Sequence, residues 1–330
     1  MTISKAPTIT PDELKTSAAK YQKELMLIPT MALKDLAEHI TFNYGIRFKE
    51  IISMIKGKAQ FGPYKEDKSN KLDLGIEGQP LETFLGNCVE TFDPNSLVKT
   101  IWGENATQGK DLKNSDLAKM VLSLLQKGVG EDIHDAVWSA VRKEGGATAQ
   151  DLFNGLDTIT TTKITEGVIS VENGNLQELP EITSVNALDV LKDFYRKADP
   201  KLKRIKTKLY VPTYILDALE DDYATTRGVN SYNTKFEVKT LEGSRGKCEI
   251  VPLDNKEGSP YIHLSPKINV NLGFNLQGGT EEKMGVEAYA PFTLTFFASQ
   301  FVGAGFRTFN KEFLKVGKLN AVVTKPEGGE

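Results

Sequence analysis

The chain has 330 residues, of which 41 are basic and 44 acidic, giving a formal net charge of −3. This length allows one large domain or two, and a hydrophobic content of 39% is ordinary for a soluble globular protein. The nearly balanced charge excludes a general nucleic-acid binder, because such a protein needs a basic excess to neutralise phosphates.

Cysteine and histidine are few and scattered. Cys88 and Cys248 are far apart and neither belongs to a CxxC motif, and the three histidines are His39, His134 and His263. This spacing argues against a metal site and is typical of free thiols in a reducing compartment. We expect no bound metal.

The ends and the apolar runs predict neither export nor a membrane span. The first twenty residues, MTISKAPTITPDELKTSAAK, lack the apolar core of a signal peptide. The most apolar run, 291–306, is shorter than the ~20 residues that a spanning helix needs, and it contains Gln300.

The first hundred residues predict a loose arm, a helical segment and a long excursion. Residues 1–11 are rich in Thr and Pro, and a helix is expected from Pro11, with Thr10 as its cap. Helical spacing continues to Ile40. From Gly45 to Pro94, strand-like runs surround a charged tip at 61–71. We expect a two-stranded excursion that must lie on something else, because it has too little core of its own.

The strongest helical pattern runs from Lys113 to Glu144, with Ser115 as a plausible cap. Gly128 and Gly130 interrupt it, so a kink or two helices end to end remain open. Its apolar residues recur at steps of three and four: Leu117, Val121, Leu124, Leu125, Val129, Ile133, Val137 and Val141.

The stretch AVRKEGGATAQDLFNGLDTI, 140–159, raises the question of a phosphate-binding turn. It has no Lys suited to a phosphate and no strand that leads into a helix. We therefore expect a corner, held on the core by Leu152, Phe153, Leu156 and Ile159.

The second half predicts alternating helices and strands. Asn173-Gly174 predicts a β-hairpin, and Ser184 is expected to cap an amphipathic helix. Residues 207–226 predict a buried strand that leads into a helix. Strands follow at 247–254, 261–276 and 287–306, and no internal repeat is present.

No motif for catalysis or cofactor binding survives inspection. The segment GENATQGKD, 103–111, has one residue too many for a phosphate loop, and Asp111 replaces the required hydroxyl. The serine-hydrolase motif GxSxG is missing. The acidic residues Glu220, Asp221 and Asp222 suit a solvated helix end better than a cation site. We expect no enzyme, no catalytic residue and no cofactor.

One segment, 196–208, is strongly basic. Aromatic residues are not interleaved in it, and Asp199-Pro200 predicts a turn, so a solvated connection is the simpler interpretation. The alternative is a surface that touches packaged nucleic acid or a neighbouring subunit. Its basic residues are Arg196, Lys197, Lys201, Lys203, Arg204, Lys206 and Lys208.

Three stretches, 83–103, 124–159 and FFASQFVGAGFRTFN at 296–310, resemble major capsid proteins of the Hong Kong 97 type, in particular those of phages and prophages of gut Bacteroidetes. The resemblance implies an α+β capsid fold. Its expected parts are an N-terminal arm and helix at 1–44, an extended loop at 45–100, a peripheral domain with a long spine helix at 101–160, an axial domain at 161–285, and a return to the peripheral domain at 286–330.

The resemblance also implies a function and partners. The chain would build pentamers and hexamers of an icosahedral virion shell, assemble in the bacterial cytoplasm and enclose double-stranded DNA without sequence specificity. A separate scaffolding protein and a portal are further expected partners. An encapsulin-like compartment shell is the alternative within this fold, and an uncharacterised hydrolase or nucleotide-binding enzyme is the alternative of another class.

The expected loop tip supplies the candidate contact with a neighbour. Phe61 and Tyr64 flank Gly62-Pro63, and Lys71 lies in the same loop. These residues are predicted to anchor the loop on an adjacent subunit, although a local hydrophobic turn explains the same pattern. Some capsid proteins join Lys to Asn between subunits, but no acceptor Asn is identifiable here, so no cross-link is predicted.

Overall fold

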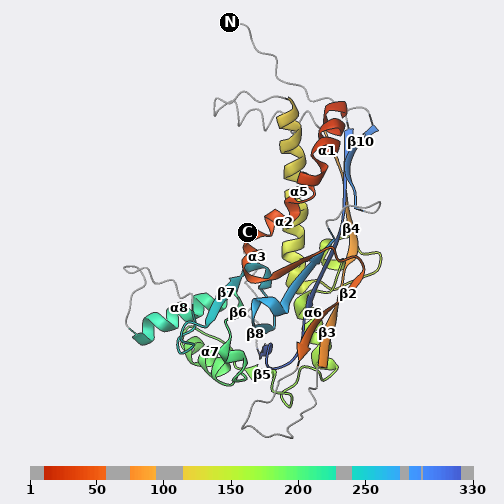
Figure 1. Cartoon of the computed structure of the whole chain (residues 1–330). Coiled ribbons are helices and arrows are strands. Elements are labelled where there is room, and N and C mark those ends of the chain that lie inside the picture. The colour runs from red at the N-terminus through yellow and green to blue at the C-terminus, as the bar shows by residue number, and fades with distance from the viewer. Residues whose placement is uncertain are drawn as a thin grey trace, which may run out of the picture.

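The computed structural model describes residues 11–56, 75–93, 114–227, 240–275, 282–290 and 293–320 (Figure 1). Its helices are α1 Pro11–Leu25, α2 Ile28–Ala32, α3 Lys34–His39, α5 Asn114–Ser139, α6 Leu156–Thr165, α7 Ala187–Arg196 and α8 Thr213–Arg227, with short 3-10 turns η1 Ala149–Asp151, η2 Leu202–Arg204, η4 Asp254–Lys256 and η5 Lys267–Asn269. Its strands are β1 Thr41–Tyr44, β2 Lys49–Lys56, β3 Gly75–Glu82, β4 Phe84–Phe92, β5 Leu176–Leu179, β6 Thr207–Pro212, β7 Cys248–Leu253, β8 Tyr261–Ser265, β9 Val270–Phe274, β10 Met284–Ala290, β11 Thr293–Phe306 and β12 Lys315–Leu319.

The first sheet is organised around the 14-residue strand β11. β10, β4 and β9 each pair with it in antiparallel register, and β1 runs parallel to β9. Apolar side chains of α1 and α5 pack on β10 and β11, and Figure 1 shows α1 between α5 and this sheet. β4 therefore belongs to the sheet, although it lies inside the range predicted for the extended loop.

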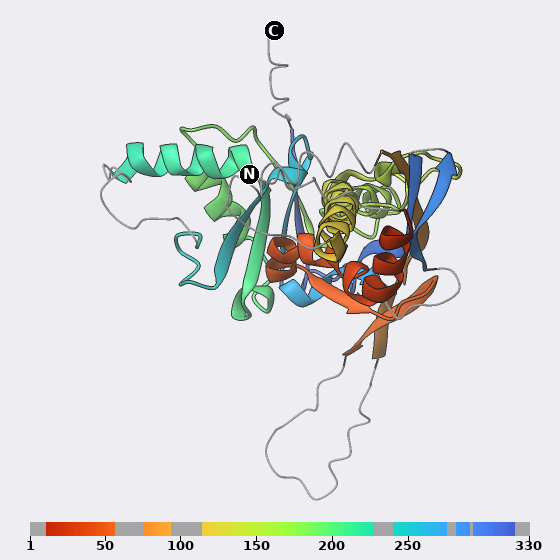
Figure 2. The same ribbon diagram turned by 90° about the horizontal axis from the view of Figure 1, so that it is seen from above.

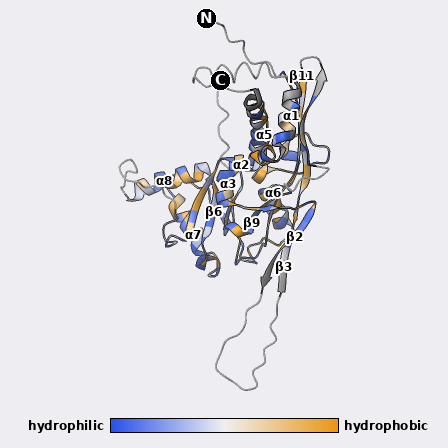
Figure 3. Ribbon diagram, turned by 45° about the horizontal axis from the view of Figure 1, so that its top comes forward, coloured by the Kyte–Doolittle hydropathy of each residue, from blue (hydrophilic) through white to orange (hydrophobic). Residues whose placement is uncertain are grey.

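The second sheet has the strand order β5-β12-β8-β6-β7. β6 and β7 are parallel, and β12 is parallel to β5 and antiparallel to β8. Helices α7 and α8 pack against it through a core of their own, and both carry hydrophilic and hydrophobic residues in Figure 3. The segment 286–330 thus contributes β11 to the first sheet and β12 to the second.

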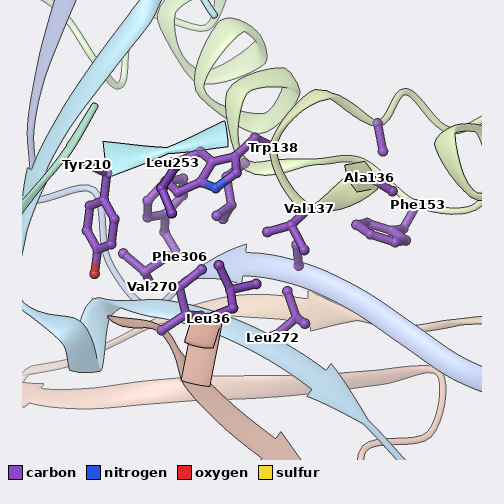
Figure 4. Packing of buried hydrophobic residues seen from close by; sticks show 14 of the residues in the cluster. Leu36, Ala136, Val137, Trp138, Phe153, Tyr210, Leu253, Val270, Leu272 and Phe306 are labelled. Carbon is purple, nitrogen blue, oxygen red and sulfur yellow. The ribbon is translucent and has the colours of Figure 1, made fainter. Parts of the chain in front are cut away.

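A continuous apolar core joins the two sheets at the end of α5. Trp138 at the end of α5 is fully buried, and its ring lies 5.6 Å from that of Tyr210 on β6. The same cluster contains Leu272 of β9 and Phe306 of β11 (Figure 4). Burying such large side chains contributes roughly 1.5–3 kcal/mol each, so this core fixes α5 relative to both sheets.

α5 is one continuous 26-residue helix that ends at Ser139, so Val141, the last residue of the predicted apolar series, lies beyond it and is 52% exposed. Ser115 lies inside the helix rather than at its cap. Its two glycines differ in their surroundings. A Cβ at Gly130 would lie 2.7 Å from the carbonyl oxygen of Pro29 in α2, whereas a Cβ at Gly128 would meet nothing within 4 Å. Gly130 therefore allows α2 to cross α5 closely, and the alternative of two helices end to end is not found.

Alanine at these two positions should have opposite effects. Gly128→Ala should raise the free energy of unfolding by about 0.5–1 kcal/mol, because Ala favours the helix and has free space there. Gly130→Ala should lower it by about 1–3 kcal/mol through the clash with α2. Urea unfolding of both variants checks this, and shifts of the same sign would contradict the account.

The corner predicted at 140–159 is confirmed. Phe153 and Leu156 are fully buried, and Leu152 and Ile159 pack against the same core. The backbone N–H of Gly155 donates to Ala140 (2.8 Å), which closes the corner, and α6 follows at once.

The hairpin predicted at Asn173-Gly174 is wrong. Asn173 and Asn175 each donate from Nδ2 to the carbonyl oxygen of Val168 (both 3.1 Å), so the segment folds back on itself as turns. The strand predicted before it lies partly in α6, and the strand after it, β5, pairs with β12 instead. A local turn signal does not determine which strand a segment pairs with.

The cap predicted for α7 is also wrong. The helix begins at Ala187, after Ser184, and the N–H of Leu188 donates to Oδ2 of Asp222 on α8 (2.7 Å). Asp222 is 4% exposed. Of the acidic cluster that the sequence places at a solvated helix end, this member is buried and joins α8 to α7.

Candidate assembly surfaces

β2 and β3 form an antiparallel ribbon that has no third strand among the described residues. It projects from the body of the molecule (Figure 2). Ile51 in β2 is 66% exposed and Phe48 before it is 59% exposed. An isolated two-stranded ribbon is at best marginally stable in water, so this surface is suited to packing on another structure.

Glycines in the first sheet allow the base of the ribbon to cross it closely. Leu81 of β3 is 1% exposed and packs over Gly273 and Gly305. A Cβ built on Gly303 would lie 1.9 Å from the carbonyl oxygen of Glu82, so no other residue fits there without moving the strand. The small residues near the end of β11 therefore serve close packing.

The ribbon base is further fixed by hydrogen bonds. The N–H of Thr83 donates to the carbonyl oxygen of Phe48 (2.8 Å), and Lys49 forms an ion pair with Glu82 (2.7 Å). Phe48 has φ = 68°, an uncommon conformation for a side-chain-bearing residue, and its ring lies edge-on to Phe301 at 5.2 Å. Such a conformation persists only where the surroundings enforce it, so the base is rigid.

A groove of about 710 Å³ runs between α5, β4 and the corner at 141–152. Burial and the carboxylates Asp135, Glu131 and Glu90 raise the pKa of Asp132, which lines it. Burial also raises the pKa of the Cys88 thiol, which disfavours the reactive thiolate of a nucleophile. One side of the groove is therefore lined by carboxylates. Its cysteine thiol is not activated.

A buried ion pair lies where α6 meets the second sheet. Nζ of Lys256 is 2.6 Å from Oδ1 of Asp157, donates to Oγ of Ser259 (2.9 Å) and lies 4.0 Å from the ring centre of Trp138. The lysine side chain is 0% exposed, and burial lowers its pKa to about 8. This pair joins the turn after β7 to α6.

His263 of β8 completes this cluster. Its Nε2 is 2.9 Å from Oγ1 of Thr160, which itself donates to the carbonyl oxygen of Leu156 (2.8 Å). Burial and the charge of Lys256 hold the histidine pKa well below its usual value. The cluster is buried and joins α6 to β8 and to the turn after β7.

The basic residues predicted at 196–208 are partly neutralised by the chain itself. Nζ of Lys203 donates to the carbonyl oxygen of Arg196. Arg204 and Lys206 are exposed, and no carboxylate within the described ranges pairs with them. The ion pairs are Lys197 with Asp193, Lys201 with Glu312, and Lys208 with Glu249.

The other predicted contact residues, Phe61, Gly62, Pro63, Tyr64 and Lys71, lie outside the described residues, as does the 103–111 segment. Within the part of the chain that the structure covers, no group of three or more His, Cys, Asp or Glu is arranged to hold a metal ion. No helix in that part is long and apolar enough to cross a membrane.

The sequence did not indicate that Lys256 is buried, or that the base of the ribbon crosses the first sheet at Gly303. Lys256 lies in the polar stretch LDNKEGSP, which is typical of an exposed turn. The run FVGAGF is visible in the sequence as small residues, but Gly303 in it packs against Glu82, which lies 221 residues earlier.

Neither protein-family models nor curated protein sequences match the chain. Solved structures do match. A chain of the satellite phage P4 procapsid, which includes the size determination (Sid) protein, aligns over 98% of this chain and 94% of its own, with a TM-score of 0.55 and 10% identity. The chain has a phage capsid fold. The capsid of the empty GTA particle also matches, with 87% of this chain and 89% of that chain covered, a TM-score of 0.50 and 12% identity. The capsid of Myoviridae phage XM1 matches with 87% of this chain and 91% of that chain covered, a TM-score of 0.50 and 13% identity.

The capsid fold confirms the predicted mixture of helix and sheet at the level of the whole chain. The division into arm, loop, peripheral and axial parts remains a prediction. At identities of 10–13%, the likeness concerns the backbone arrangement alone.

Proposed function

We propose that the chain is the major capsid protein of a double-stranded DNA phage or prophage, and that its copies assemble into pentamers and hexamers of an icosahedral shell. The observation that carries this is the capsid fold, shared with a phage P4 procapsid chain over 98% of this chain. In this proposal the protein is structural, and it resides in the virion after assembly in the bacterial cytoplasm.

The ribbon β2–β3 is the element that we propose to contact a neighbouring copy. Ile51 exposes an apolar side chain on a two-stranded ribbon that is rigid at its base. The tip at 57–74, with Phe61, Gly62, Pro63, Tyr64 and Lys71, is proposed to extend this contact. Each contact can be weak, because a subunit in a closed shell makes many of them at once.

Several finer features are part of the same proposal. The sequence resemblance supports an origin in phages or prophages of gut Bacteroidetes. The shell would enclose DNA without sequence specificity, and a separate scaffolding protein and a portal would take part in assembly. An encapsulin-like shell would carry protein cargo instead of DNA. The ratio of absorbance at 260 nm to that at 280 nm, measured on purified shells, distinguishes enclosed DNA from protein cargo.

Ile51→Glu should block assembly while leaving the subunit folded. The new carboxylate would be buried without a partner in the contact, so the protein concentration needed for assembly should rise by about tenfold or more, while the melting temperature stays unchanged. Light scattering as a function of protein concentration measures the concentration needed for assembly, and calorimetry measures the melting temperature. Val171→Glu is the matched control, since Val171 is 63% exposed and lies outside the ribbon. Normal assembly of Ile51→Glu would contradict the role of the ribbon.

A further inference from the structure

A group of basic residues lies where strands β6 and β7 begin, and an acidic helix, α8, follows the end of β6. They are parallel, so the segments that enter them meet at one edge of the sheet. The N–H of Thr207 donates to the carbonyl oxygen of Lys247 (2.8 Å), and Nζ of Lys247 donates to that of Arg204 (3.0 Å). Lys206 and Arg245 lie in the same two segments, and we call these four basic residues the entry edge.

The acidic surface lies at the opposite edge. β6 ends at Pro212 and α8 begins at the next residue, so six strand residues, roughly 20 Å, separate the entry edge from α8. α8 projects from the side of the molecule (Figure 1). Asp217, Glu220 and Asp221 are exposed and share one face of this helix, while Leu219 is buried beneath.

Among the described residues, no ion pair neutralises either surface. None of the four entry-edge residues pairs with a carboxylate of the described residues, and none of the three α8 acids pairs with a cation there. Ile205, at the centre of the entry edge, is 38% exposed. An apolar side chain among cations suits a contact that excludes water, as between proteins, better than a contact with phosphates.

We propose that the entry edge of one copy binds the acidic face of α8 on the next copy. The two surfaces differ and lie on opposite edges, so the contact is head-to-tail, and head-to-tail contacts close into rings when the rotation permits. Opposite charges would guide this pairing and disfavour incorrect orientations. The proposal rests on the proposed shell function and adds to it the surfaces that meet around a ring.

Charge reversal of the full-length chain tests this contact. The basic-edge variant carries Arg204→Glu, Lys206→Glu and Lys247→Glu, and the helix variant carries Asp217→Lys, Glu220→Lys and Asp221→Lys. Each alone should raise the concentration needed for assembly by about tenfold or more, because like charges would then face each other. The combined variant should assemble as the wild type does. Circular dichroism establishes that each variant is folded.

Mixing the two variants gives a sharper result. In a ring that alternates them, every contact again joins opposite charges, but only if the number of subunits is even. A mixture should therefore recover hexamers and not pentamers, as negative-stain images would show. As a control, Lys34→Glu, Lys311→Glu and Lys318→Glu, which change the charge equally elsewhere, should leave assembly unchanged.

Two outcomes would overturn the contact. One is a combined variant that assembles no better than either parent variant. The other is a basic-edge variant that assembles normally but whose shells hold less DNA, which would assign the edge to nucleic acid. Both outcomes leave the proposed shell function intact, whereas a wild-type chain that forms neither rings nor shells would overturn that function itself.

Discussion

Lys256→Met should lower the free energy of unfolding by about 3–5 kcal/mol at neutral pH, because it leaves the carboxylate of Asp157 buried and unpaired. The lysine side chain is 0% exposed and that of Asp157 is 11% exposed, so water cannot replace the lost partner. Denaturant unfolding measures the effect. Lys318→Met, at an exposed position, is the control and should change stability by less than about 0.5 kcal/mol.

A double variant separates the ion pair from simple loss of packing. Lys256→Met combined with Asp157→Leu removes both charges, and replacing a buried ion pair by apolar side chains is often neutral or stabilising. The double variant should therefore regain most of the lost stability. If it is as unstable as Lys256→Met, the unpaired carboxylate is not the cause.

The same lysine predicts a pH dependence of definite sign. Its pKa is about 8 in the folded protein and 10.5 in its unperturbed state. Between these values the unfolded chain binds more protons than the folded one, so this group increases stability as the pH rises. The difference in stability between wild type and Lys256→Met should thus widen from pH 8 to 10. A difference that narrows over this range would contradict the assignment.

Gly303→Ala should displace the ribbon base and prevent assembly. The added Cβ would lie 1.9 Å from the carbonyl oxygen of Glu82, and backbone cannot move aside as a side chain can. We expect a loss of about 1–3 kcal/mol or more in the free energy of unfolding. Loss of shells in light scattering should accompany it, because the ribbon can no longer cross the sheet at the same place.

Gly305→Ala is the matched control for this position. It lies two residues further along β11, and its Cβ would lie 3.0 Å from Cδ1 of Leu81, a side-chain end that can shift. Its effect on stability and assembly should be clearly smaller. Equal effects of the two alanines would show that the clash with the backbone of Glu82 does not set the cost at Gly303.

Elements with a strong apolar period could be predicted from the sequence. Val121, Ile133 and Val137 of the series predicted along α5 are buried, whereas Leu124 is 56% exposed. The corner residues Phe153 and Leu156 are buried as predicted. In these segments the local pattern and the tertiary environment agree, because each presents one apolar side to a core.

Features that depend on distant partners could not be predicted. The Asn173-Gly174 signal is local, whereas β5 is formed by pairing with β12, more than 130 residues later. Lys256 stands in a polar stretch and is buried only because α6 and Trp138 close over it. Sequence patterns report which residues prefer burial, and a charged residue buried by its partner has no such pattern.

Light scattering on a size-exclusion column, with negative-stain images of each fraction, tests the shell function most directly. The account predicts rings of five or six copies, or closed shells tens of nanometres across. Shells that enclose DNA should show a higher ratio of absorbance at 260 nm to 280 nm than protein alone. A wild-type chain that stays monomeric at every concentration, with and without a co-expressed scaffolding protein, would contradict it.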